Sequence, residues 1–76
     1  MEHYLADGTP LNQELDEVIV MDSEGETEFS GIVEDIDLDE GLVLVRVIDK
    51  EWTKRYPHLL QSNGLIWFDS SLVRPA

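Results

Sequence analysis

Short apolar runs alternate with turns along the chain, and the runs have the period of β-strands. Residues 17–21 form a β-branched run that ends in the turn residues 22–25. Residues 26–36 alternate apolar and polar side chains, which is typical of a half-buried strand. Gly31 within this second run predicts a strong bend or a close backbone approach. The first half of the chain is therefore expected to form a hairpin.

The second half predicts three more strands. Residues 42–49 are apolar on both faces, so we expect a central strand that is covered on both sides. Residues 65–68 predict a fourth strand, 69–71 a tight turn, and 72–74 a last short strand. Residues 50–64 contain a proline and an Asn-Gly pair and predict a connection.

One helical element is expected near the start. Thr9 is a candidate N-cap and Pro10 suits the first helical position, which predicts one or two helical turns over residues 9–15. Together with the five strands this predicts a mainly β fold, a small and strongly bent barrel. The 76 residues suffice for one domain, 1–76, with a small core.

Charge is distributed unevenly. The formal net charge is −12, and residues 1–40 hold fourteen of the seventeen acids and no Lys or Arg. Residues 41–76 hold the other three acids and all five basic residues. A negative field repels phosphate backbones, so a basic protein partner is the simpler expectation. The alternative is an acidic surface that serves only solubility.

Several classes of function are disfavoured by what the chain lacks. It has no cysteine, and its longest apolar run is too short to cross a bilayer, so we expect a cytoplasmic protein without a membrane partner. His3 and His58 lie far apart and are interpreted as surface residues. Ser70 and Ser71 lack the context of a nucleophile. We therefore expect no enzyme, no cofactor and no metal site.

The acidic segment 35–41 offers carboxylates at the first, third and fifth positions of a calcium loop. The sixth and twelfth positions are Glu40 and Arg46, where such a loop has Gly and Glu. An acidic hairpin turn with Gly41 in the left-handed conformation explains the same residues better.

Apolar residues, a glycine and an aspartate at positions 29, 31, 33, 37, 42 and 44 lie on a spacing that resembles the first motif of Sm-like proteins, the ring-forming family that includes the bacterial RNA chaperone. Gly41 stands where that family has an Asn, and residues 66–72 keep the hydrophobic frame of the second motif. Pro10-Leu11, Val18–Val20 and Gly25 are similar to the family's helix, first strand and hairpin glycine. The residues on the first-motif spacing are Phe29, Gly31, Val33, Asp37, Leu42 and Leu44. The resemblance implies an SH3-like or Sm-like barrel.

By position, the resemblance also implies where a nucleotide pocket would lie. Four of its six residues are carboxylates, which have the wrong sign for phosphate, so we expect weak or absent RNA binding. Phe68-Asp69 replaces the family's Arg-Gly. The pocket positions are Asp37, Asp39, Glu40, Gly41, Phe68 and Asp69.

Two further sets of residues are candidates for contacts with partners. The predicted fourth and fifth strands are apolar edges that would pair between subunits, through Leu65, Ile66, Trp67, Phe68, Leu72 and Val73. Basic and aromatic side chains interleave only at residues 50–56, where Trp52, Lys54, Arg55 and Tyr56 would contact nucleic acid or a partner, or else pack against the barrel.

Three functions follow as hypotheses. The leading one is a non-enzymatic Sm-like binding or scaffold module, of phage or bacterial origin, that assembles with itself into a homo-oligomeric ring. The second is a monomeric acidic inhibitor that imitates the charge of nucleic acid and blocks a basic protein. The third is an RNA-binding Sm-like ring.

Overall fold

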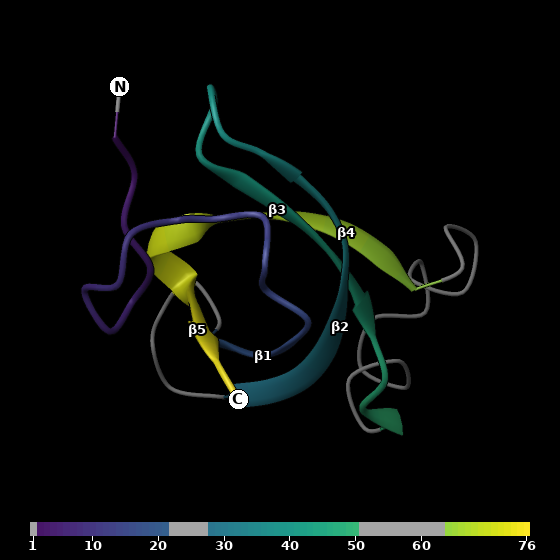
Figure 1. Cartoon of the computed structure of the whole chain (residues 1–76). Coiled ribbons are helices and arrows are strands. Elements are labelled where there is room, and N and C mark those ends of the chain that lie inside the picture. Colours follow the sequence, from purple (N-terminus) through teal and green to yellow (C-terminus); the bar gives the residue numbers. More distant parts are fainter. Residues whose placement is uncertain (1, 22–27, 51–63) are drawn as a thin grey trace.

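The computed structural model describes residues 2–21, 28–50 and 64–76, and it shows a mainly β fold (Figure 1). One antiparallel sheet has the strand order β4-β3-β2-β1-β5. The predicted five-stranded architecture is confirmed. The strands are β1 (Glu17–Met21), β2 (Glu28–Asp37), β3 (Leu42–Val47), β4 (Leu65–Asp69) and β5 (Val73–Pro75).

The long strand β2 bends the sheet into a small barrel. Its first part pairs with β1 and its second part with β3, and Gly31 takes part in both pairings. A side chain at Gly31 would overlap Val45 and lie 3.0 Å from the carbonyl oxygen of Arg46. The close approach predicted from this glycine is confirmed, and it lets β2 curve across the sheet.

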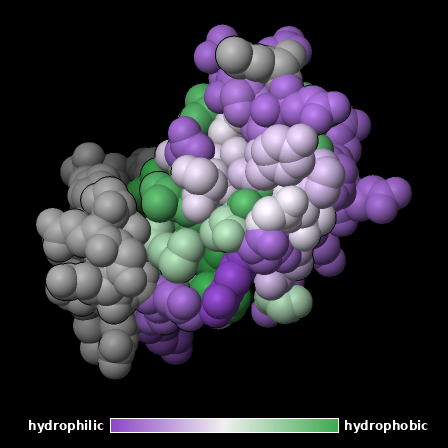
Figure 2. All heavy atoms as spheres, turned by 90° about the vertical axis from the view of Figure 1, so that its left-hand side faces the viewer, coloured by the Kyte–Doolittle hydropathy of each residue, from purple (hydrophilic) through white to green (hydrophobic). Residues whose placement is uncertain are grey.

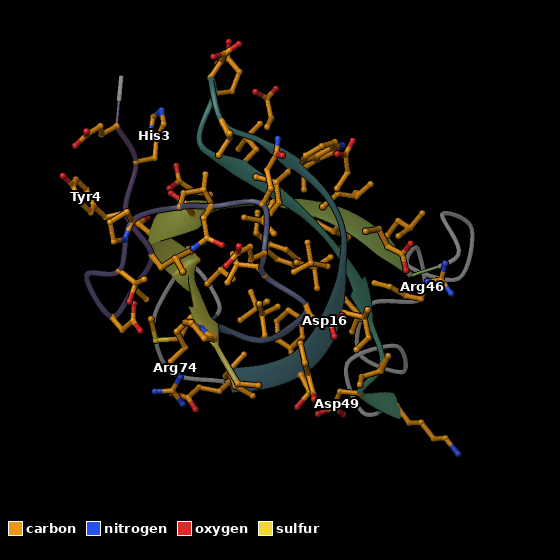
Figure 3. All side chains as sticks on the ribbon, in the orientation of Figure 1. His3, Tyr4, Asp16, Arg46, Asp49 and Arg74 are labelled. Atoms are coloured by element: carbon orange, nitrogen blue, oxygen red, sulfur yellow. The ribbon has the colours of Figure 1, made fainter. Side chains whose placement is uncertain are left out.

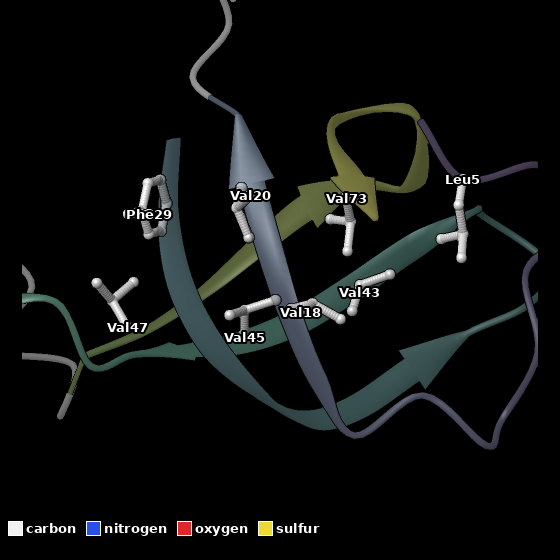
Figure 4. Packing of buried hydrophobic residues seen from close by; sticks show 8 residues of the cluster. All are labelled: Leu5, Val18, Val20, Phe29, Val43, Val45, Val47 and Val73. Atoms are coloured by element: carbon white, nitrogen blue, oxygen red, sulfur yellow. The ribbon is translucent and has the colours of Figure 1, made fainter. Parts of the chain in front are cut away.

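The core consists mainly of valines that alternate along β1 and β3 (Figure 4). Phe29 contributes the one large ring of the buried cluster, and Phe68 packs against it with ring centroids 5.6 Å apart. Successive side chains of a strand point to opposite faces, so every second residue of each strand contributes to this inner face. The buried residues are Leu5, Val18, Val20, Phe29, Val43, Val45, Val47 and Val73.

A β-bulge interrupts the alternation of β2. The register with β3 shifts between Val33 and Asp35, so that Val33 opposes Val45 whereas Ile36 opposes Val43. Both Val33 and Ile36 pack against the core, although strict alternation would place them on opposite faces. The bulge therefore turns Asp35 to the outer face.

Strand β3 lies between β2 and β4, and β2 occupies the middle of the sheet. Leu42 and Leu44 on the outer face of β3 are half-buried, and Arg46 is exposed. The sequence predicted a central strand covered on both sides. The strand is paired on both edges, but only its inner face is fully buried.

The helical turn predicted over residues 9–15 is wrong. Pro10 forms a β-bridge with Tyr4, and the Asn12 side chain accepts a bond from the backbone N–H of Glu14. Asx turns of this kind offer the backbone an alternative to a helix. The segment instead lays Leu11 and Leu15 against the core.

Of the predicted turns, 69–71 forms a 3-10 turn (Ser70–Leu72), and residues 22–25 and most of 50–64 lie outside the described residues.

Candidate functional site

Strand pairing brings the predicted pocket positions together at one end of the barrel. Asp37 is the register partner of Leu42, and Leu42 is the partner of Asp69. The backbone N–H of Ser70 donates to the carbonyl oxygen of Gly41 at 2.9 Å, which joins the β2–β3 turn to the end of β4. Hydrophilic residues cover the upper part of the face in Figure 2, the end at which Figure 1 places this hairpin.

The β2–β3 turn is held by one carboxylate. Oδ1 of Asp37 accepts the backbone N–H groups of Asp39 at 3.1 Å and Glu40 at 3.0 Å. Gly41 follows with φ 69° and donates to the carbonyl oxygen of Asp37 at 2.9 Å. The acidic hairpin turn preferred above is confirmed.

His3 lies directly over this turn, a contact that no local pattern in the sequence indicates (Figure 3). Its Nε2 is 3.2 Å from the carbonyl oxygen of Asp39, and a side chain at Gly41 would overlap its ring. Leu11 holds this part of the chain by donating to the carbonyl oxygen of His3 at 2.8 Å. The imidazole thus occupies the space above Gly41, and His3 is half-buried where the sequence suggested a surface residue.

Asp69 caps the 3-10 turn that follows β4. Its Oδ1 accepts the backbone N–H of Ser71 at 3.0 Å and the Ser71 hydroxyl at 2.9 Å. These bonds, the backbone one foremost, lower the pKa of the Asp69 carboxyl below its ordinary value; slight desolvation opposes them and His3 adds a small attraction. Asp69 is therefore ionised at neutral pH and already hydrogen-bonded.

Phe68, the residue before Asp69, packs against the core. Its ring is tilted by 59° against that of Phe29. The side chain of Phe68 is half-buried. The six positions lie at one end of the barrel, where four of them are carboxylates and the His3 ring covers Gly41.

The outer face of β2, β3 and β4 carries a different set of residues in cross-strand rows. Asp35 opposes Leu44, and Leu44 opposes Trp67. Trp67 is 45% exposed, and Leu38 beyond the end of β2 is 41% exposed. The row therefore begins with a carboxylate, crosses an aliphatic side chain and ends on an indole ring.

A groove of about 500 Å³ runs over this region. A second hollow of about 310 Å³ adjoins it, because Gln13, Asp35 and Ile36 line both. The residues that line the larger groove are Gln13, Asp35, Ile36, Asp37, Leu38, Asp39 and Trp67. Sequence reasoning grouped Asp35, Asp37 and Asp39 in one acidic segment and assigned Trp67 to a subunit interface. It did not place Trp67 beside these carboxylates, because the β-bulge that turns Asp35 to the outer face is not visible in the alternation.

The residues predicted for the subunit interface divide into two groups. Val73 is fully buried, and Ile66 and Phe68 pack against the core, so their side chains serve the fold of the single chain. The outward positions of β4 are Leu65 and Trp67, and Leu72 is half-buried in the 3-10 turn. Trp52, Lys54, Arg55 and Tyr56, the predicted basic and aromatic contact, lie outside the described residues.

The edge of β4 has backbone groups that are not used within the described chain. Gly64 accepts from Val47 and Ser70 donates to Gly41, so these even-numbered positions face β3. Because bonding residues alternate in an antiparallel pair, Leu65 and Trp67 direct their N–H and C=O groups away from β3. Nothing in the described segments pairs with them.

The edge of β5 is occupied. Its outward residues are Val73 and Pro75, because the neighbouring Ala76 bonds to Glu17 of β1. The Val73 N–H donates to the carbonyl oxygen of Ser70, and the Val73 carbonyl oxygen accepts from Ala6 at 2.8 Å. Pro75 has no N–H to offer. Within the described segments, the outward backbone groups of β4 are therefore unpaired, whereas those of Val73 in β5 are already hydrogen-bonded.

Comparison with models of protein families, with curated proteins and with solved structures found no match to this chain. Among residues 2–21, 28–50 and 64–76, no group of three or more His, Asp or Glu side chains is placed to hold a metal ion. The same residues contain no helix that is long and apolar enough to span a membrane.

Proposed function

We propose that this protein is a non-enzymatic binding or scaffold module that assembles with itself into a homo-oligomeric ring through the free edge of β4. The observation that carries the proposal is the edge of β4, whose outward backbone groups are not paired within the described segments. An exposed apolar strand edge is a template for another strand, and proteins either cover such an edge or use it. The resemblance to Sm-like proteins, together with a bacterial or phage origin, belongs to the same proposal.

A ring requires a second strand edge to which the β4 edge of the next subunit can bind. The edge of β5 meets this requirement once Ala6 releases the carbonyl oxygen of Val73. Losing that hydrogen bond costs about 1 kcal/mol, and a hydrogen bond from the β4 edge of the next subunit to the same oxygen would offset this cost. The N-terminal segment would then move aside as subunits join.

Substitution of Trp67 by proline provides a sharp test. Its N–H points away from β3, so Trp67→Pro removes a donor from the free edge and no bond from the β3–β4 ladder. Ile66, the residue before it, is extended, as a residue preceding proline must be. Trp67→Val is the matched control, because it removes the same indole and keeps the N–H.

The measurement is molar mass by light scattering after size exclusion, with far-ultraviolet circular dichroism to verify the fold. We expect a mass several times the 8.7 kDa of one chain for the wild type and for Trp67→Val, and a folded 8.7 kDa monomer for Trp67→Pro. A wild-type mass of twice 8.7 kDa would indicate a dimer, which is compatible with pairing through the β4 edge but refutes the ring. A monomeric wild type would overturn self-assembly and favour the acidic inhibitor of a basic protein.

A further inference from the structure

We propose that the groove beside Trp67 binds an extended segment of a partner protein that carries arginine or lysine side chains. The inference deepens the proposed function, on which it rests, by naming the partner chemistry of the module. The groove is lined by side chains near the end of β2 and by the outward-facing Trp67, whereas assembly would use the backbone edge of β4. The two surfaces are therefore compatible in one molecule.

The apolar part of the groove suits the aliphatic stem of a long basic side chain. Ile36, Leu38 and Trp67 line it, and the exposed indole offers a face over which a guanidinium or ammonium group is attracted. Arginine and lysine bury their stems along apolar surface and keep their charged ends at its rim. In this groove the rim is formed by carboxylates.

The carboxylates along the rim have acceptor capacity left for a cation. Oδ1 of Asp35 accepts the backbone N–H of Ile36 in β2 at 2.8 Å, and Oδ1 of Asp37 accepts those of Glu40 and Asp39 in the following turn at 3.0–3.1 Å. No bond to the second oxygen of either carboxylate occurs within the described segments. A guanidinium group can therefore bind Oδ2 without disturbing the turn.

The arginines of the described segments are engaged elsewhere. Arg46 pairs with Glu34 at 3.2 Å and Arg74 pairs with Glu28 at 2.8 Å, and both point away from the barrel in Figure 3. The groove thus keeps a negative rim that is not neutralised by these two cations. Charge complementarity selects a basic occupant.

The arrangement of the carboxylates favours a chain over a single ion. They follow one another along the end of β2 and do not converge, since no three of them in the described segments are placed to hold a metal. Cations repeated along an extended polypeptide match such a row. Phosphate backbones are repelled by it, so the partner is a protein segment and not a nucleic acid.

The experiment is a fluorescence anisotropy titration of the full chain into a labelled (Arg-Gly)₄ peptide, with a (Glu-Gly)₄ peptide as the negative probe. Asp35→Asn/Asp37→Asn is the test variant, because asparagine keeps the Oδ1 acceptor and replaces the charged Oδ2 by a neutral NH2 group. Asp7→Asn/Glu17→Gln is the matched control, because it removes two charges at exposed positions outside the groove. Trp67→Val tests the indole.

We expect the test variant to weaken binding about tenfold, Trp67→Val to weaken it severalfold, and the control to change it less than about twofold. Equal losses in the test and control variants would show diffuse attraction to an acidic protein and overturn the site. Absence of binding, or tighter binding of an oligouridine probe, would overturn it as well.

Light scattering on Asp35→Asn/Asp37→Asn separates this proposal from the previous one. We expect its mass to equal that of the wild type, because neither side chain touches the β4 edge. Unchanged mass with unchanged peptide affinity would refute the groove and leave the assembly standing. A wild type that binds the peptide as a monomer would refute the assembly and leave the groove standing.

Discussion

Replacing Gly41 by alanine tests the contact between the N-terminal segment and the β2–β3 turn. Gly41 has φ 69°, a conformation that costs an ordinary residue about 1–2 kcal/mol. The added methyl group would also overlap the His3 ring and displace it. Displacement loses the 3.2 Å contact of Nε2 with Asp39, a hydrogen bond with a net contribution of about 1 kcal/mol.

These two effects separate in a double-mutant cycle. We expect Gly41→Ala to lower the free energy of unfolding by about 2–3 kcal/mol in the wild type, but by only about 1–2 kcal/mol in a His3→Ala background. In that background no ring is left to displace, and only the backbone strain counts. The coupling between the two substitutions should therefore be about 1 kcal/mol.

The cycle is measured by urea denaturation of the four proteins at pH 7 and one protein concentration, followed by far-ultraviolet circular dichroism. Equal denaturant slopes would show that the four transitions are comparable. Costs that add to within about 0.5 kcal/mol would refute the contact, because independent sites behave in that way. The N-terminal segment would then not be seated on the turn.

Two further predictions concern the sheet and the 3-10 turn. Gly31→Ala should lower the free energy of unfolding by about 1–3 kcal/mol, since its methyl group meets Val45 and the Arg46 backbone; an unchanged urea midpoint would show that β2 and β3 have room to move apart. For Asp69, the folded-state pKa lies below the ordinary 3.8, so its ionised form stabilises the fold above about pH 4, and this contribution disappears as pH falls through the folded-state pKa. The stability difference between wild type and Asp69→Asn in urea should therefore shrink as pH falls from about 5 through the folded-state pKa, and a difference that does not change with pH would contradict the capping role assigned to Asp69.

The sequence by itself determined the five strands, but it assigned Ile66, Phe68 and Val73 to a subunit edge, whereas they pack in the core. Residues 17–21 were predicted as a strand and form β1 with the same bounds, because a β-branched run between polar residues has few other ways to bury its side chains. The turns at Gly41 and at Asp69 were also predictable, since each depends on a glycine or a carboxylate acting within a few residues. This strand and these turns each depend on residues that lie close together in the sequence.

The tertiary structure decided what the surface of the barrel offers. The bulge after Val33 has no marker in the alternation, because a bulge depends on how β2 must curve over β3, and it alone brings Asp35 to the groove. The expected helix over 9–15 lost to a path that lays Leu11 and Leu15 on the core and places His3 over Gly41. The His3 contact with Asp39 joins residues 36 positions apart, and contacts of this kind form only in the finished barrel, which local propensity does not contain.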